Sequence, residues 1–351
     1  MKNSKTLFSL ALLLSTILIS CTINDDIVSD DHTAIIPCTG FNKNLLTLST
    51  TFDNDPNAEI DYNYFLINNL DSSLPNSNGS FTTNTDLTFQ LPTSTSFYNQ
   101  TNNLHGILVT RAGKYFSFNT NTEVGQEFVV PTSLTAPIEL NNSTYVIEVS
   151  NGGYANSGIG NHYEIKSFDI NTGTVGATLP IDPLTKDFDN NSFFHVESIS
   201  AATNNTDELY YLSGTNLVTV NTSLNTASHI DLYPSFSSSD YVRFFGLEYS
   251  ESLGLIAIMD NATQGNKFVV KIDPLTGNYS SPLSISNNIN SEFYSTTYRE
   301  CDHTYYLTSL NQGSNTVQTL YFEFDLITNN VINSQIFPDY TFGIEFISET
   351  P

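Results

Sequence analysis

Glutamates occupy matching places in several strand-like segments of this chain. Glu248 ends the run FFGLE and Glu345 ends TFGIE, while Glu197 in FHVES and Glu139 in APIEL fit the same place. His195 precedes Glu197 by two residues, which puts both side chains on one face of a strand. Carboxylates that converge in a partly buried site hold a proton or attract a hard cation such as Ca²⁺. A histidine beside them adds a candidate general base.

Two interpretations of this glutamate set stay open. In the structural interpretation, which we favour, each glutamate accepts backbone N–H groups or channel waters and holds neighbouring segments in register, and His195 is a hydrogen-bonded filler. In the functional interpretation, the four glutamates and His195 form a ring that binds a ligand or a cation. No Asn or Asp set aligns with the glutamates, so we assign no catalytic residue and no cofactor beyond a Ca²⁺ ion in the channel.

The elements that must position these glutamates recur at a nearly constant spacing. An aliphatic run that ends in Asp or Asn is typical of a β-strand followed by an Asx turn, and it occurs six times. The turn residues are Asn68, Asn119, Asp169, Asn221, Asp273 and Asp325, at intervals of 51, 50, 52, 52 and 52 residues. So regular an interval indicates a structural repeat.

One repeat, residues 241–288, shows what each unit contains. Strand-like runs at 241–249, 253–260, 268–273 and 278–286 become less apolar in that order and are separated by polar turns. Four short antiparallel strands in about 50 residues describe one blade of a β-propeller, with the first strand innermost. The glutamates then lie on the innermost strands, which line the central channel. Outside residues 1–20 no helical periodicity is present, which excludes helical solenoids and coiled coils.

The C-terminal segment predicts how the ring closes. FGIEF at 342–346 copies FGLEY at 245–249 almost residue for residue, so it has the sequence of a first strand. The N-terminal unit, at about residues 45–92, has no convincing first strand of its own. We therefore predict an all-β, six-bladed propeller over residues 38–351, closed by the C-terminal strand joining blade one. Seven blades is the alternative.

The N-terminal segment has the form of a bacterial lipoprotein signal. Two lysines precede an apolar run that is too short to span a bilayer, and residues 18–21 read LISC. LISC resembles the lipobox, which implies that residues 1–20 are removed and that Cys21 is lipidated. The alternative is an ordinary signal peptide with a free cysteine near the cleavage site. Residues 21–37 are expected to be an acidic tether.

The acidic residues after Cys21 also resemble the export signal of surface lipoproteins in Bacteroidota. The resemblance implies an outer-membrane lipoprotein that faces the cell surface, or otherwise the periplasm. With Cys21 assigned to lipid, Cys38 and Cys301 remain. In an oxidising compartment they could form a disulfide that staples the ring, or they could be two separate buried thiols.

The charge balance restricts the partners. The net charge is −25, and removing residues 1–20 takes away two lysines and no acidic residue, which leaves 9 basic against 36 acidic residues and a net charge of −27. Such a surface repels nucleic acid, and it repels anionic membranes except through the lipid itself. Cations and basic partners are favoured. We expect a monomer.

The turns DINTG at 169–173 and DPLTG at 273–277 resemble the repeats of quinoprotein-like and surface-layer-type bacterial propellers. That group includes enzymes and scaffolds, so the resemblance implies a fold and leaves the function open. The chain contains no tryptophan, which excludes tryptophan–aspartate repeats, sialidase Asp-boxes and the Trp-ringed quinone site of alcohol dehydrogenases. Six-bladed hydrolases of the gluconolactonase type hold a divalent ion with Glu, Asn and Asp, of which only the glutamates have counterparts in this chain.

Two functions from different classes follow. The first, which we favour, is a lipid-anchored propeller of the cell envelope that acts without catalysis as a binding or scaffold module for a protein or glycan partner. The second is a divalent-metal-dependent hydrolase or lyase with its site in the central channel.

Overall fold

The structure is a computed structural model that describes residues 45–50, 59–65, 77–83, 96–110, 112–150, 162–181, 199–232, 242–311, 313–314 and 316–347. Internal contacts divide the chain into two units, Met1–Thr39 and Gly40–Pro351. All described strands belong to the second unit. The predicted signal segment, tether and lipidation site at Cys21 lie outside the described residues. Among the helices of the described part, none is long and apolar enough to cross a membrane.

The described strands form six antiparallel sheets, each of four strands that run in order from the innermost to the outermost. Blade 1 contains β24 (Tyr340–Phe346), β1 (Leu45–Thr50), β2 (Glu59–Phe65) and β3 (Ser77–Thr82). Blade 2 contains β4 (Ser96–Asn99), β5 (Leu104–Val109), β6 (Lys114–Asn119) and β7 (Val124–Val129). Blade 3 contains β8 (Leu134–Leu140), β9 (Ser143–Ser150), β10 (His162–Asp169) and β11 (Thr174–Thr178).

The other three blades follow the same plan. Blade 4 contains β12 (Ser200–Thr203), β13 (Glu208–Ser213), β14 (Asn216–Asn221) and β15 (Thr226–Asp231). Blade 5 contains β16 (Val242–Ser250), β17 (Gly254–Asn261), β18 (Asn266–Ile272) and β19 (Tyr279–Ile285). Blade 6 contains β20 (Ile289–Arg299), β21 (Thr304–Asn311), β22 (Thr319–Asp325) and β23 (Asn330–Phe337). The short 3₁₀ helix η3 (Glu300–Asp302) connects β20 to β21.

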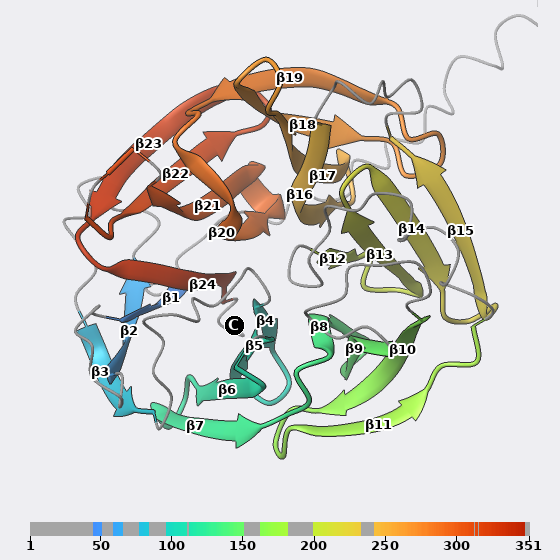
Figure 1. Cartoon of the computed structure of the whole chain (residues 1–351), viewed down its shortest axis with the longest axis vertical. Helices are drawn as coiled ribbons and strands as arrows, with labels where there is room; N and C mark the ends of the chain where they lie inside the picture. Colours follow the sequence, from blue (N-terminus) through green and yellow to red (C-terminus); the bar gives the residue numbers. More distant parts are fainter. Residues whose placement is uncertain are drawn as a thin grey trace, which may run out of the picture. The chain divides into compact units, whose positions relative to one another are not determined.

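The six sheets are arranged radially, with β4, β8, β12, β16, β20 and β24 nearest the centre of the ring (Figure 1). The predicted six-bladed propeller is therefore confirmed, and the seven-bladed alternative is wrong. The predicted closure is confirmed as well. The C-terminal strand β24 pairs antiparallel with β1, from Thr50 opposite Tyr340 to Leu45 opposite Phe346. Backbone hydrogen bonds between the two ends of the unit thus complete blade 1.

In blades 2 to 6 the repeated turn that follows the third strand is an Asx turn. Asp273 Oδ1 accepts the Leu275 N–H at 2.9 Å and Oδ2 accepts the Thr276 hydroxyl at 2.7 Å. The N–H of Gly277, at a φ of 71°, donates to the Asp273 carbonyl at 2.8 Å. Asp325 makes the same side-chain bonds to its own turn. Asn68, the first turn residue predicted, lies outside the described residues.

The apolar core is divided among the spaces between neighbouring blades. Five of these spaces hold clusters of at least nine buried hydrophobic residues each, many of them Tyr and Phe. In the described part of the chain, aromatic side chains thus pack between neighbouring blades. The sixth space lies between blades 6 and 1. Its cluster has five members: Leu45, Tyr306, Tyr321, Phe337 and Ile344.

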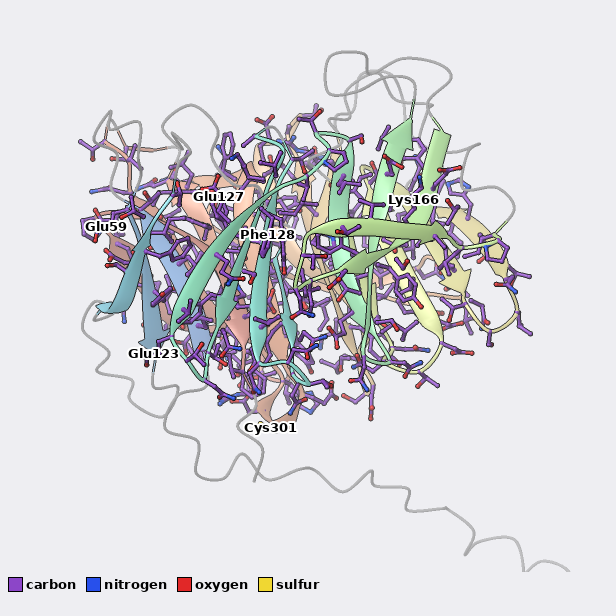
Figure 2. All side chains as sticks on the ribbon, turned by 90° about the horizontal axis from the view of Figure 1, so that it is seen from below. Glu59, Glu123, Glu127, Phe128, Lys166 and Cys301 are labelled. Carbon is purple, nitrogen blue, oxygen red and sulfur yellow. The ribbon has the colours of Figure 1, made fainter. Side chains whose placement is uncertain are left out.

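Polar contacts supplement this smaller cluster at the closing space. The Ile344 N–H donates to Ser295 Oγ at 2.8 Å, and the Phe346 N–H donates to Thr297 Oγ1 at 3.1 Å. Cys301, in η3 at the lower side of the ring in Figure 2, is disulfide-bonded. Cys38 lies outside the described residues, so the pairing of Cys301 with Cys38 stays a prediction.

Candidate functional site in the central channel

A cavity of about 240 Å³ lies where the innermost strands meet. All six of these strands contribute to its wall, so the cavity belongs to the whole ring and not to one blade. Its polar lining residues are Ser96, Tyr98, Glu139, Ser200, Thr203, Asn205, Glu248, Tyr249, Tyr294, Thr296, Tyr298 and Glu345. Three of the predicted glutamates therefore line one cavity.

Two glycines set the direction of Glu248 and Glu345. The pairing of β16 with β17 shifts register between Phe245 and Glu248, and a matching shift occurs where β24 pairs with β1. Gly246 and Gly343 lie in these shifts with φ of 66° and 62°, a left-handed conformation that suits glycine. A bulge of this kind re-aims the side chain that follows it. The shared FG-x-E pattern is therefore a bulge followed by a channel carboxyl.

Glu139 lies one residue away from the position that was predicted for it. In β8 the register shifts between Thr135 and Ile138, so Ile138 pairs with β9 as Glu248 pairs with β17. Glu139 comes one residue later. Successive strand residues point to opposite sides, and Glu139 accordingly contacts the preceding blade. Glu139 thus lines the cavity, but its place in β8 is not equivalent to the place of Glu248 in β16.

Each of these three carboxyls accepts a hydrogen bond from an uncharged side chain of a neighbouring blade. Thr296 Oγ1 in β20 donates to Glu248 Oε1 at 2.7 Å, and Ser96 Oγ in β4 donates to Glu345 Oε1 at 2.7 Å. Asn99 Nδ2, also in β4, donates to Glu139. These contacts link neighbouring blades, but the donors are side chains and not the backbone N–H groups or channel waters that the structural interpretation named.

Burial and mutual repulsion keep these carboxyls from ionising easily. Burial raises the pKa of Glu248 to about 8, against a smaller opposing effect of the Thr296 hydrogen bond. Burial, together with the charge of Glu248, raises the pKa of Glu345 well above its usual range. Burial also raises the pKa of Glu139. At neutral pH, Glu248 is therefore mostly protonated and is able to donate a hydrogen bond as well as accept one.

Tyrosines and one serine complete the polar lining. Tyr249 stacks on Tyr210 of the preceding blade, with ring centroids 5.8 Å apart. The Tyr298 hydroxyl lies 3.1 Å from Ser250 Oγ and 2.7 Å from His303 Nδ1. Ser200 is 8% exposed, and its Oγ makes no hydrogen bond to any described residue. Ser200 in the cavity wall thus has a buried hydroxyl that makes no hydrogen bond within the described part of the chain.

His105 is a buried histidine on the second strand of blade 2. It lies inside β5 with 1% exposure, beside Gly343. Burial lowers its pKa to about 3, and the nearby Gly343 backbone opposes this shift only partly. Its counterpart in blade 6 is Tyr305, which packs against the other bulge and donates to the Gly246 carbonyl at 2.6 Å. His105 is therefore a neutral packing residue against the closing strand.

The complete glutamate ring cannot be traced, because His195 and Glu197 lie outside the described residues. Among the residues that are described, no group of three His, Cys, Asp or Glu side chains is placed to hold a metal ion. The predicted Ca²⁺ site stays a hypothesis. Sequence reasoning missed the hydrogen-bond donors Ser96, Asn99 and Thr296, because only the closed ring brings their strands beside the glutamates.

Comparison with known proteins adds the fold class and nothing more specific. No family model matches the chain, and no curated protein matches its sequence. Among solved structures, TolB from Acinetobacter baumannii aligns with a TM-score of 0.55 and 10% identity, over 88% of this chain and 67% of the TolB chain. At that identity the likeness shows a shared fold alone.

Two further alignments are weaker. A chain of a nidogen/laminin complex aligns at a TM-score of 0.48 and 8% identity, over 87% of this chain and 98% of that chain. A quinoprotein alcohol dehydrogenase-like protein from Bacteroides thetaiotaomicron aligns at a TM-score of 0.42 and 10% identity, over 86% of this chain and 68% of that chain. The propeller fold is shared with TolB, and the predicted likeness to quinoprotein-like and surface-layer-type repeats stays a prediction.

Proposed function

We propose that this chain is a lipid-anchored β-propeller of the bacterial cell envelope that binds a protein or glycan partner through its central cavity and catalyses no reaction. The LISC sequence at residues 18–21 and the acidic segment after it support an anchor at Cys21 and an outer-membrane location, on the cell surface or the periplasmic face. The strongly acidic composition supports basic or uncharged partners over nucleic acid.

One observation carries the binding role. The cavity is built by all six innermost strands and is lined by carboxyls that hydroxyl and amide groups of neighbouring blades hold in place. A concave site with a few well-oriented polar groups among apolar and aromatic side chains is typical of ligand binding. Glu345 and Glu248 accept hydrogen bonds from the hydroxyls of Ser96 and Thr296, and no histidine of the described part of the chain is hydrogen-bonded to either carboxyl.

A cavity-filling variant tests this proposal. Ala201 lines the cavity from β12, and Ala201→Phe would occupy its space; Ala177→Phe places the same side chain on the exposed outer strand β11 as a control. The signal-less chain and both variants would be incubated with envelope extract and with a glycan array, and the capture of each partner would be quantified. We expect wild type and Ala177→Phe to capture the same partner in similar amounts. Ala201→Phe should capture at least about tenfold less of that partner. Equal capture by all three would contradict a site in the cavity.

The metal-dependent enzyme remains the rival function, and the same preparation distinguishes it. Purified protein would be analysed for divalent metal and then heated with and without Ca²⁺. A stoichiometric divalent ion together with a large thermal shift, since a ligand at about 100 times its Kd stabilises by about 2.7 kcal/mol, would favour the hydrolase or lyase. The proposed binding module requires neither.

A further inference from the structure

The chemistry of the cavity wall restricts the ligand further, and this inference rests on the cavity being the binding site of the proposed function. Glu248 and Glu345 come from β16 and β24 and interact electrostatically. Glu248 accepts one hydrogen bond from Thr296, and Glu345 accepts one from Ser96. A carboxylate can accept about four hydrogen bonds. Acceptor capacity for a ligand with several N–H donors therefore remains on both groups.

A second, independent feature of the wall is the hydroxyl of Ser200. Ser200 lines the same cavity and is 8% exposed, and its buried Oγ makes no hydrogen bond to a described residue. A buried hydroxyl without a partner is destabilising unless a water or a ligand satisfies it. An ammonium group has three N–H donors. Glu248, Glu345 and Ser200 each have an oxygen atom that can accept one of them.

Aromatic and aliphatic groups lie on the same wall. The side chains of Tyr249, Tyr294 and Tyr298 line the cavity together with Leu247 and Ile138. Aromatic faces attract ammonium cations, and apolar walls suit an alkyl stem. The chain as a whole is acidic, with 36 Asp and Glu residues against 11 Lys and Arg, so its field draws cations toward it.

We infer that the central cavity binds a primary alkylammonium group, of the kind a lysine side chain of a partner protein presents, with Glu248 and Glu345 ionising to receive it. The amino group of an amino sugar offers the same charge without the alkyl stem. The apolar wall favours the lysine-like arm. A neutral alcohol of the same shape would lack the charge that draws the two carboxyls into their ionised form.

The inference has a pH dependence of definite sign. Below about pH 8, Glu248 carries a proton in the free protein and must release it to bind an ammonium ion, so affinity should rise with pH. The titratable groups of the described part of the chain that interact with Glu248 or line the cavity with it are Glu345, Glu139, Tyr305, Tyr249, Tyr294, Tyr298 and Tyr98. For Tyr305, Tyr298 and Tyr98 burial raises the pKa above 10, so the carboxyls dominate the titration. An alkylamine stays charged to about pH 10.

Calorimetric titration with n-pentylamine and with 1-pentanol tests the inference on the wild-type chain. From about pH 6 to about pH 7.5, we expect the Kd for pentylamine to fall by about tenfold per pH unit for each proton released. The Kd for pentanol should stay level. A pentylamine Kd that does not change with pH, binding no tighter than that of pentanol, or no detectable binding would each overturn the inference.

Two Glu→Gln variants test whether pentylamine binding depends on Glu248. Glu248→Gln keeps the shape of the side chain and an acceptor for Thr296, and it should weaken pentylamine binding by at least about tenfold at alkaline pH and flatten the pH dependence. Glu292→Gln makes the same charge change at an exposed position of β20 and should leave binding unchanged. Equal losses in both variants would overturn the inference. If Glu248→Gln does not fold, the wild-type comparison of the two probes still decides.

Two further probes identify the source of the amine, namely Nα-acetyl-lysine amide and D-glucosamine. Tighter binding of the lysine derivative supports a protein side chain, and tighter binding of glucosamine overturns that part of the inference. The same measurements distinguish failure of the ammonium inference from failure of the proposed binding function. If pentylamine does not bind but Ala201→Phe still removes partner capture, the cavity is a binding site for another chemistry.

Discussion

Two buried titratable groups, Glu248 on the innermost strand β16 and His105 on the second strand β5, oppose each other in the pH dependence of stability. Glu248, with a pKa near 8, is held protonated by the fold, while His105, with a pKa near 3, is held neutral. The unfolded chain would titrate them at about 4.3 and 6.5. The Glu248 contribution is complete below about pH 4.3 and is lost as pH rises through 8, whereas the His105 contribution is complete above about pH 6.5 and is lost as pH falls toward 3.

Between about pH 6.5 and 8 the cavity carboxyls, whose pKa values the fold raises, should shift stability, whereas His105 should not. In this range the folded state binds protons that the unfolded state has released. The free energy of unfolding should therefore fall with rising pH, by at most about 1.4 kcal/mol per pH unit for each proton. Urea unfolding of the wild type and of Glu248→Gln would measure it, with a shallower slope expected for the variant. A wild-type slope of zero, or the same change in Glu292→Gln, would contradict a buried protonated Glu248.

At the scale of the element, two inner strands use a glycine bulge to direct a carboxyl into the channel. Gly343 in β24 has a φ of 62°, and a Cβ there would lie 2.3 Å from Ile107 Cδ1 and 3.2 Å from His105 Cε1. Gly265, in the turn between β17 and β18, has a φ of 66° but has no atom within 4 Å of the same point. The two glycines share a backbone conformation and differ in packing.

Alanine at these two positions separates backbone strain from packing. We expect Gly265→Ala to cost about 1 kcal/mol, from left-handed strain alone. Gly343→Ala adds overpacking against Ile107 and should cost about 2–4 kcal/mol. Thermal or denaturant unfolding of both variants would measure the difference. Similar losses would show that the bulge in β24 is not the tightly packed position that the structure describes.

The same bulges explain which parts of the site could be predicted from the sequence. Glu248 and Glu345 were recognisable because both bulges have a glycine two residues before the glutamate, in a repeated FG-x-E pattern. In β8 the bulge falls at Ala136, with a φ of 49° and no glycine, so the offset of Glu139 left no sequence signal. The donors Thr296 and Ser96 belong to other blades. Such contacts depend on how the ring closes, which local sequence patterns do not encode.

For the whole molecule, the spacing of the Asx turns and the copied C-terminal strand were enough to predict six blades and their closure. Each unit packs mainly on its neighbours, so a local pattern repeated six times determines the ring. The space between blades 6 and 1 is the exception. Its apolar cluster is small, and the buried hydroxyls of Thr47, Tyr306 and Thr308 make no hydrogen bond within the described residues. Closure there depends on strand pairing and on polar contacts from Ser295 and Thr297.

The central claim is that the ring assembles a binding cavity around Glu248 and Glu345. A crystal structure of the signal-less chain with n-pentylamine, at a pH above about 8, tests it most directly. The account predicts the ammonium nitrogen in the central cavity, within hydrogen-bonding distance of both carboxylates and with its alkyl stem along Leu247. Pentylamine bound only at the outer strands, with neither carboxylate in contact, would contradict it.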